Sequence, residues 1–600
     1  MCGIYSIKGS DAINKTIQGL KKLEYRGYDS CGVAYKNNNI KILKTKGYVS
    51  ELDKLLPNAS SDISIGHTRW ATHGKPSDQN SHPHSSESGK FVCVHNGIIE
   101  NYKNIKKSLL SDVNFKTMTD TEVIPNLIEY YYNSNNSILE SIKRTLINLQ
   151  GSMAICVLSE YDNNIYFARL ASPLVIAKVD NDYIICSDIN GLPDKSQVFY
   201  LPDNSYGVLD TDFHVFDING TPIDIIYKDY SSEFDKANTN TYKYFMLKEI
   251  NEIPKAIEVT YDYLSDLKLT LPSDVEHILF VSCGTSYHAS LIAKKMIEKY
   301  AHIPVDCEIA SEYLCDTYLT KPKTLAVFIS QSGETADTLK SLALAKSKGM
   351  YTLAITNVEN SSITHVADST ILMRAGAEIC VASTKAYTTQ IFVLIVLCGL
   401  LQQLKAKNIL TQNEFVQLSF KRSDSLFTDQ ELYNLLSIDI NAFSQVLDKI
   451  ANEIYSTKVF HIIGKDLDYI TVMESALKIK EINYIFTDAY PCGELKHGTL
   501  SLIEEGSIVF VIITQKENAS KTMNALHEVT ARGGKVICVT TLDDLDFGKC
   551  EYVIKLPKVA SIFDPIVSII PFQLLSYKIC LKLGLNPDKP RNLAKSVTVE

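Results

Sequence analysis

Apolar and polar positions in the first third of the chain alternate between helical and strand-like spacing. In residues 12–23, apolar side chains recur every three or four positions, which predicts a helix that buries one face. The apolar run 91–94 predicts a buried strand that ends at the polar residues 95–97. A second helical pattern begins at Val123. We therefore expect a mixed α/β domain here.

The remaining two-thirds repeats one pattern, an apolar strand followed by a loop and a long helix, which predicts parallel α/β sheets. Residues 279–284 resemble 460–464 and residues 327–331 resemble 512–515, at offsets of about 180 residues. Two copies of one domain explain this self-similarity. The expected organisation is a domain at 2–225, a linker at 226–243, domains at 244–425 and 426–588, and a tail at 589–600.

Composition and charge narrow the function classes. The 600 residues exceed what one hydrophobic core supports, and a net charge of −9 disfavours broad contact with nucleic acid or an anionic membrane. The 14 cysteines include no C-x-x-C pair, so neither a zinc module nor a disulfide framework is expected. No leader pattern opens the chain, and the longest apolar run, 391–401, is shorter than the ~18–20 residues of a membrane span. We expect a cytoplasmic protein.

Cys2 is the first candidate for chemistry. Cysteine is small enough to permit removal of Met1, and Cys2 would then carry both a thiol and a free α-amine. An α-amine has an ordinary pKa of about 7.7–8.0, so near neutral pH a fraction of it is able to accept the thiol proton. The alternative is that Cys2 only begins a strand.

Three further segments hold candidate partners for that thiol. A turn at Asn96-Gly97 would leave backbone N–H groups free to hold an oxyanion, although a plain hairpin turn explains the same pair. The Arg69 guanidinium suits a carboxylate and Asp120 suits an ammonium, so together they would bind an amino-acid head group. Alternatively, Thr119 or Asp120 simply caps the following helix.

Short sequence blocks occur in the order seen in class II glutamine amidotransferases. The blocks are Cys2-Gly3-Ile4, Tyr25-Arg26-Gly27-Tyr28-Asp29-Ser30, His67-Thr68-Arg69-Trp70-Ala71-Thr72-His73-Gly74, His95-Asn96-Gly97 and Thr119-Asp120-Thr121-Glu122. The chain resembles that family, and the resemblance implies an N-terminal-nucleophile αββα sandwich that releases ammonia from glutamine. The implied roles are Cys2 as nucleophile and base, Asn96 and Gly97 as oxyanion donors, and Arg69, Thr72, His73 and Asp120 as glutamine ligands.

Hydroxyl-rich turns in the first copy predict a phosphate site. Residues 283–286 and 330–335 each follow a predicted strand and open a helix, where free N–H groups and hydroxyls bind an anion. The alternative is that Ser330 and Thr335 are ordinary helix caps. Nucleotide motifs are absent from the sequence, and the corresponding turn of the second copy, 514–518, has no such run of hydroxyls. We expect only the first copy to bind phosphate.

The second copy supplies acid–base candidates. Glu474, Lys478 and Glu481 share one helical stripe, which is also the spacing of a solvated salt-bridge ladder. The loop at 491–498 contains His497, whose ordinary pKa suits proton transfer.

The two copies resemble a pair of sugar isomerase (SIS) domains, which are doubly wound, flavodoxin-like parallel sheets. Their order behind the amidotransferase part resembles the isomerizing glutamine–fructose-6-phosphate aminotransferases. The blocks that carry this resemblance are Ser330-Gln331-Ser332-Gly333-Glu334-Thr335, Val381-Ala382-Ser383-Thr384-Lys385, Gly493-Glu494-Leu495-Lys496-His497-Gly498 and Pro590-Arg591-Asn592-Leu593-Ala594-Lys595-Ser596-Val597-Thr598-Val599-Glu600.

That resemblance implies the substrates glutamine and fructose 6-phosphate, the product glucosamine 6-phosphate, no cofactor or metal, and a homodimer. The implied sugar-phosphate ligands are Thr285, Ser286, Ser330, Gln331, Ser332, Thr335, Val381, Ser383 and Lys478. It also implies a Schiff base at Lys595, proton transfer by Glu481, ring opening by His497 from the neighbouring subunit, and an ammonia gate at Trp70 and Arg26.

Two short segments depart from the family pattern. Thr499 stands where a proline is usual, and Lys465-Asp466 replaces an expected Arg-Gly. Two other functions remain open: a class II amidotransferase with a different acceptor, and a non-catalytic sugar-phosphate sensor.

Overall fold

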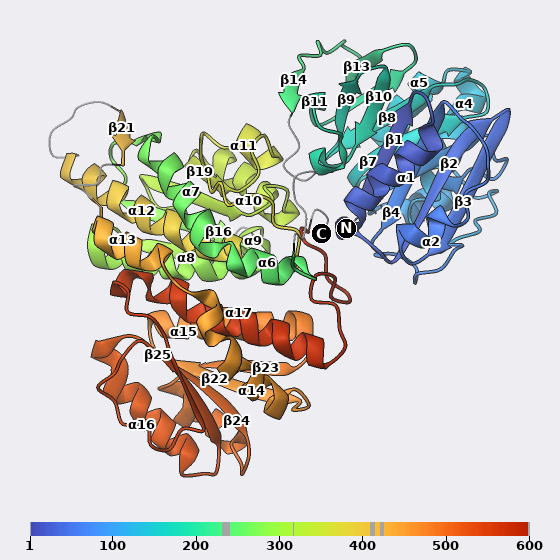
Figure 1. The fold of residues 1–600 in the computed structure, drawn as a ribbon. Helices are drawn as coiled ribbons and strands as arrows, with labels where there is room; N and C mark the ends of the chain where they lie inside the picture. The colour runs from blue at the N-terminus through green and yellow to red at the C-terminus, as the bar shows by residue number, and fades with distance from the viewer. Residues whose placement is uncertain (1, 231–240, 316, 408–413, 421–424, 598–600) are drawn as a thin grey trace. The chain divides into compact units, whose positions relative to one another are not determined.

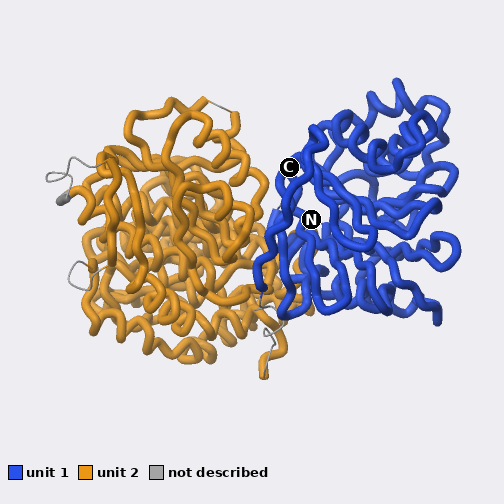
Figure 2. The backbone as a smooth tube through the Cα atoms, turned by 90° about the horizontal axis from the view of Figure 1, so that it is seen from above, with its two compact units in different colours: residues 1–238, 594–600 blue, residues 239–593 orange. Residues whose placement is uncertain are grey.

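The computed structural model describes residues 2–230, 241–315, 317–407, 414–420 and 425–597. The chain divides into two compact units (Figure 2): unit 1 comprises residues 1–238 and 594–600, and unit 2 comprises residues 239–593.

Unit 1 contains two antiparallel sheets, one of eight strands in the order β14-β11-β9-β10-β1-β4-β2-β3 and one of six in the order β13-β12-β8-β7-β6-β5 (Figure 1). The eight strands are β1 Gly3–Lys8, β2 Ser30–Asn37, β3 Asn39–Lys46, β4 Ile63–Arg69, β9 Val175–Val179, β10 Asp182–Cys186, β11 Ser196–Tyr200 and β14 Lys228–Tyr230. The six are β5 His84–Ser85, β6 Phe91–Ile99, β7 Gly151–Ser159, β8 Ile165–Leu170, β12 Ser205–Leu209 and β13 Phe213–Asp217. The helices are α1 Ala12–Leu23, α2 Val49–Asp53, α3 Tyr102–Ser108, α4 Val123–Asn135 and α5 Ile138–Asn148.

Unit 1 consists of four layers, and an apolar cluster lies between each layer and the next. One cluster joins the inner faces of the two sheets, for example Ile65 of β4 with Val94 of β6. A second packs α1 on the outer face of the eight-stranded sheet, and a third packs α4 and α5 on the outer face of the six-stranded sheet. The predicted αββα sandwich is confirmed, and α1 has the predicted bounds because its apolar stripe is buried.

One expectation for this unit is wrong. The strand that was expected to end at Asn96-Gly97 continues to Ile99, with Gly97 opposite Met153 of β7, so neither the oxyanion turn nor the plain hairpin turn forms there. Gly97 has φ +131°, a conformation that glycine adopts without strain, and a Cβ at this position would lie 2.0 Å from the Ser152 carbonyl oxygen. Residues 228–230 of the expected linker form β14, and residues 231–240 lie outside the described residues.

Unit 2 contains two five-stranded parallel sheets with the same topology, β17-β16-β18-β19-β20 and β23-β22-β24-β25-β26 (Figure 1). The first copy has β16 His277–Ser282, β17 Val305–Ile309, β18 Thr324–Ser330, β19 Tyr351–Thr356 and β20 Ser369–Leu372; the second has β22 Val459–Gly464, β23 Phe486–Pro491, β24 Ile508–Ile513, β25 Lys535–Thr540 and β26 Tyr552–Lys555. A short antiparallel pair joins β15 Lys268–Pro272 and β21 Phe415–Ser419. In each copy the second strand in sequence lies at the edge and the first and third are neighbours, which is the flavodoxin-like order, so the predicted repeat is confirmed.

The helices of unit 2 surround these sheets. They are α6 Phe245–Asn251, α7 Ile253–Ser265, α8 Gly284–Met296, α9 Ala310–Tyr313, α10 Ala336–Ser347, α11 Ser362–Val366, α12 Lys385–Lys407, α13 Asp429–Leu436, α14 Ser444–Ile454, α15 Leu467–Asn483, α16 Ala519–Thr530 and α17 Asp564–Lys582.

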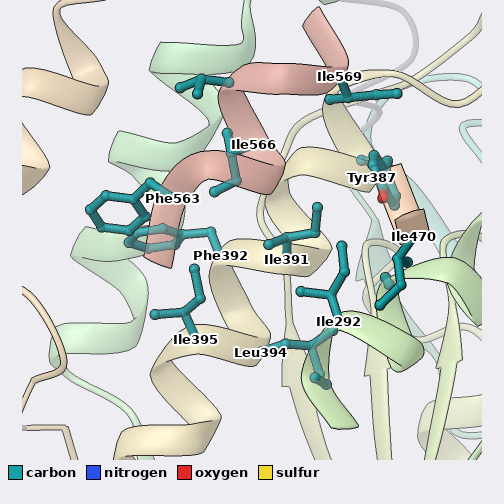
Figure 3. Close-up of a cluster of buried hydrophobic side chains, with 14 of the residues drawn as sticks. Ile292, Tyr387, Ile391, Phe392, Leu394, Ile395, Ile470, Phe563, Ile566 and Ile569 are labelled. Carbon is teal, nitrogen blue, oxygen red and sulfur yellow. The ribbon is translucent and has the colours of Figure 1, made fainter. Parts of the chain in front are cut away.

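One continuous apolar core joins the two copies. Figure 3 shows Phe392 of α12 beside Phe563 and Ile566 at the start of α17, with Ile292 of α8 and Ile470 of α15 in the same cluster. Two helical segments, 385–405 and 561–582, are long and apolar enough to cross a membrane by length and composition, but 89% and 94% of their apolar windows are buried inside the protein. They are core helices of this unit.

Candidate functional site

The Cys2 side chain lines a narrow cavity of unit 1, about 10 Å³ in volume. Its lining residues are Cys2, Arg69, Trp70, Thr72, His82, His95, Gly97, Thr119, Asp120 and Thr121. The pairing of β1 with β4 brings Cys2 here, and the backbone N–H of Trp70 donates a hydrogen bond to the Cys2 sulfur at 3.4 Å. Burial raises the pKa of the thiol, while the Trp70 N–H and the charges of Arg69 and Arg26 oppose that shift. The thiol therefore needs a base.

A buried ion pair holds the backbone of Cys2. Arg26, which is 1% exposed, pairs with Asp188 and donates from Nε to the Cys2 carbonyl oxygen at 3.2 Å. The Asn96 side-chain amide donates to the same carbonyl at 3.0 Å, and Gly97 lines the cavity. The residues predicted as oxyanion donors thus lie beside Cys2, although on a continuing strand.

Charged groups of opposite sign face this cavity. Arg69 donates through Nη2 to the carbonyl oxygens of His73 and Gly74, whereas its Nη1 is buried with no hydrogen-bond partner among the described residues. Asp120 accepts the Ile99 N–H at 2.7 Å and lies 4.0 Å from His73 Nδ1. Neither Thr119 nor Asp120 caps α4, whose N-cap is Glu122 without a side-chain cap, so the capping alternative is wrong.

Sequence reasoning missed a cluster of four buried histidines, His67, His82, His84 and His95, of which His82 and His95 line the cavity. The rings of His67 and His82 stack with their centroids 4.0 Å apart. His95 contacts the Thr121 hydroxyl at 2.9 Å, and His84 contacts the Thr119 hydroxyl at 3.3 Å. Burial lowers the pKa of all four, for His67 to about 3, so the cluster is neutral and holds the segment around Asp120. Strand pairing assembles the cluster from separate segments, a proximity for which the sequence carries no signal. Among the described residues, no group of His, Cys, Asp or Glu is arranged to hold a metal ion.

In unit 2, the hydroxyl-rich turns lie at neighbouring strand ends. β16 and β18 pair in parallel and are the strands at which the sheet order reverses, the usual place for a ligand in such sheets. The Ser330 hydroxyl contacts Thr335 Oγ1 at 2.9 Å and accepts the Gly333 N–H at 3.1 Å. Thr335 occupies the N-cap position of α10, as the alternative expected, but its side chain makes no capping hydrogen bond.

A buried chain of charges joins the two copies through α8 and α15. Lys478 lies 3.2 Å from Glu474 and 2.7 Å from Glu481, and Thr285 bonds both Glu474 (3.0 Å) and Lys478 (3.2 Å). Lys478 and Glu474 are fully buried, so the solvated ladder is wrong. Burial alone would lower the pKa of Lys478, but the two glutamates outweigh it and hold that pKa raised. Glu474 and its partner His288, at 2.7 Å, were missed as site residues although Glu474 shares the predicted stripe.

Other predicted sugar ligands are held by residues that the sequence did not single out. Gln390 donates to the Ser286 hydroxyl at 3.1 Å, and Ser383 donates to Glu378 at 3.2 Å. The Val381 N–H already donates to a backbone carbonyl, that of Asp588, at 3.2 Å.

Two further predicted residues lie on a short helix and on the terminal segment. His497 is exposed at the end of the short helix η6 (Glu494–His497), and among the described residues no hydrogen bond or ion pair connects it to Glu481. Lys595 is half-buried in the terminal segment grouped with unit 1. Its role stays a prediction.

The corresponding turn of the second copy is filled by a carboxylate. Asp468, at the start of α15, accepts the backbone N–H groups of Thr514 (2.9 Å) and Gln515 (3.4 Å) and also the Thr514 hydroxyl. The Gln515 side-chain amide donates to Asp564 at 3.2 Å. An internal anion therefore occupies the strand end at which the first copy presents Ser330 and Gln331.

These carboxyls make unit 2 sensitive to pH. Burial raises the pKa of Asp468 to about 7 and that of Asp564 to about 8, with added repulsion from Asp466 and Glu517 respectively and between the pair. In the unfolded chain both carboxyls have a pKa of about 3.9. Above that pH the unfolded state releases protons that the folded state retains, so we expect the free energy of unfolding to fall between about pH 4 and pH 8.

Urea unfolding at pH 5 and pH 8 measures this fall in the free energy of unfolding. It is on the order of 1.4 kcal/mol for each unit by which a carboxyl's pKa in the folded state exceeds its pKa in the unfolded state. Asp564→Asn removes one titrating proton and should show a shallower dependence. An equal slope in the variant and the parent would contradict the assignment.

Known proteins match the whole chain. The description "SIS domain" fits residues 273–398 and 453–582, and "Glutamine amidotransferase domain" fits residues 67–194. Proteins called glutamine–fructose-6-phosphate aminotransferase (isomerizing) from Clostridium tetani and Francisella tularensis are 42% and 40% identical, with 100% of both chains covered. The solved C-terminal domain of glucosamine-fructose-6-phosphate aminotransferase from Francisella tularensis covers 59% of this chain and 100% of its own, at 35% identity and a TM-score of 0.52.

The two family models describe the same two kinds of domain that the structure shows. Such similarity over the full length, together with the Cys2 cavity and the paired parallel-sheet copies, establishes that the chain belongs to the isomerizing glutamine–fructose-6-phosphate aminotransferase family.

Proposed function

We propose that this enzyme transfers the amide nitrogen of L-glutamine to D-fructose 6-phosphate and isomerises the product, giving D-glucosamine 6-phosphate and L-glutamate. The observation that carries the proposal is the presence on one chain of the Cys2 cavity and the hydroxyl-lined ends of β16 and β18. The first suits amide cleavage, and the second suits a phosphorylated sugar.

In the glutamine half, Arg69 Nη1 binds the substrate carboxylate and Asp120 its ammonium, with Thr72 and His73 completing the pocket. After removal of Met1, the α-amine of Cys2 takes the thiol proton, and the sulfur attacks the side-chain amide. Asn96 and Gly97 stabilise the oxyanion. The carbon–nitrogen bond then breaks, ammonia leaves with the proton, and water hydrolyses the thioester to glutamate.

In the sugar half, the phosphate is held at the first copy only, because Asp468 fills the equivalent turn of the second. The proposed ligands are Thr285, Ser286, Ser330, Gln331, Ser332, Thr335, Ser383 and the backbone of Val381. His497 assists ring opening, and Lys595 then forms a Schiff base at C2 of the open-chain ketose with loss of water. Ammonia displaces Lys595 from C2 to give the sugar imine, and Glu481 moves the proton between C1 and C2. Lys478 orients Glu481 through their 2.7 Å ion pair and contacts the sugar.

Ammonia passes between the sites inside the protein, gated by Trp70 and Arg26. A closed route suits the chemistry because free ammonia near pH 7 is mostly protonated and no longer nucleophilic. We further propose a cytoplasmic homodimer in which His497 acts on the partner's sugar, which agrees with its exposure on η6. The acid and base groups named here need no metal or organic cofactor.

The test supplies glutamine and fructose 6-phosphate to the purified full chain and measures glutamate and glucosamine 6-phosphate. Equal amounts of the two products are expected. An amidotransferase with another acceptor would make glutamate without amino sugar, and a sugar-phosphate sensor would make neither; each result would overturn the proposal.

A further inference from the structure

A second cavity lies in unit 2, between α8 of the first copy and the start of α15 of the second. Its volume is about 510 Å³, within the range of about 300–1,000 Å³ typical of small-molecule sites. Its lining residues are Leu291, Lys294, Lys295, Lys465, Asp466, Tyr469, Ile470, Met473 and Asn518. None of them belongs to the sugar-phosphate turns at 283–286 and 330–335.

The cavity is cationic. Three lysines line it against one carboxylate, Asp466, which pairs with Lys295 at 2.9 Å. Lys294 pairs with Glu298 at 3.1 Å. The side-chain ammonium of Lys465 has no hydrogen-bond or ion-pair partner within the described residues, so it is available to an anion.

Asp466 has an unusual backbone. Its φ of 57° and ψ of −117° lie in a region that glycine adopts freely and other residues adopt only at a cost of about 1–3 kcal/mol. The strained residue directs its carboxylate to Lys295 on the facing helix, so the pair links the two walls of the cavity. Strain of this kind concentrates at ligand sites.

The rest of the lining is apolar or aromatic. Leu291, Ile470 and Met473 form apolar wall, and the half-buried Tyr469 adds a ring that is available for stacking. A ligand that matches both the lysines and the apolar lining carries a phosphate group beside an apolar or aromatic body. We propose that this cavity binds a small phosphate ester of that kind, with Lys465 and Lys295 on the phosphate and Tyr469 on the body.

Lysine acetylation followed by mass spectrometry tests this site separately from the sugar-phosphate turns. Phenyl phosphate is the probe, and inorganic phosphate and phenol are its two halves. With phenyl phosphate, the acetylation rates of Lys465 and Lys295 should fall about threefold or more, since one charge-assisted contact protects each amine. Lys299, which lies outside the lining, should react at an unchanged rate.

Two variants complete the test. Lys465→Gln should raise the phenyl phosphate concentration that half-protects Lys295 about fivefold, and Lys299→Gln should leave it unchanged. Tyr469→Ala should abolish the advantage of phenyl phosphate over inorganic phosphate. Equal protection of Lys299, no protection of Lys465, or equal potency of phenyl and inorganic phosphate on the parent would each overturn the proposal.

Discussion

Cys2→Ala is expected to abolish glutamine-dependent synthesis of amino sugar, with a loss of at least about 10³-fold, because it removes the nucleophile itself. Among the residues that the structure describes, Cys2 is the only cysteine that lines the unit 1 cavity, and the Trp70 N–H donates a hydrogen bond to its sulfur. Coupled measurement of glutamate and glucosamine 6-phosphate reports the loss. Synthesis from high concentrations of ammonium should persist, because the proposed sugar site does not include Cys2.

The matched control is Cys315→Ala, which changes an exposed cysteine of unit 2 and should leave both activities unchanged. A Cys2→Ala enzyme that still uses glutamine at more than a few per cent of the parental rate would contradict the role of the thiol.

Lys478→Met is expected to destabilise unit 2 by about 3–5 kcal/mol, because it leaves the buried carboxylate of Glu474 without its cation. Amino-sugar synthesis should also be lost, because Glu481 loses its 2.7 Å partner. Urea unfolding measures the first effect. Glutamine hydrolysis by unit 1 should remain.

Lys480→Met is the control, since Lys480 is exposed on the same helix and should change stability by less than about 0.5 kcal/mol. Adding Glu474→Gln to Lys478→Met should restore part of the stability without restoring synthesis. A destabilisation by Lys478→Met no larger than that of the control would show that the charge chain is not coupled as described.

The sequence predicted best those helices and strands whose buried positions can be identified from their own residue pattern. The stripe of α1 and the apolar runs of β16 and β22 carry their own periodicity, and the similarity of the two copies follows from those runs. The strand through Gly97 was misjudged because an Asn-Gly pair favours a turn unless a neighbouring strand holds it extended, as β7 does.

The sequence predicted which residues make up the candidate sites, but not whether each of them is buried or exposed. The spacing of Glu474 and Lys478 is the same for an exposed and a buried pair, and only the packing of α15 against α8 and α17 makes this one buried. The histidines around His82 come together through strand pairing, which no local pattern encodes. Asp468 likewise fills a turn 46 residues away in sequence.

We propose that nitrogen released at Cys2 reaches the sugar without entering solution. Glutamine labelled with ¹⁵N in its side-chain amide, supplied with fructose 6-phosphate and a large excess of unlabelled ammonium, tests this internal transfer. We expect glucosamine 6-phosphate that carries nearly full ¹⁵N label by mass spectrometry. Label diluted to the isotopic composition of the bulk ammonium would rule internal transfer out.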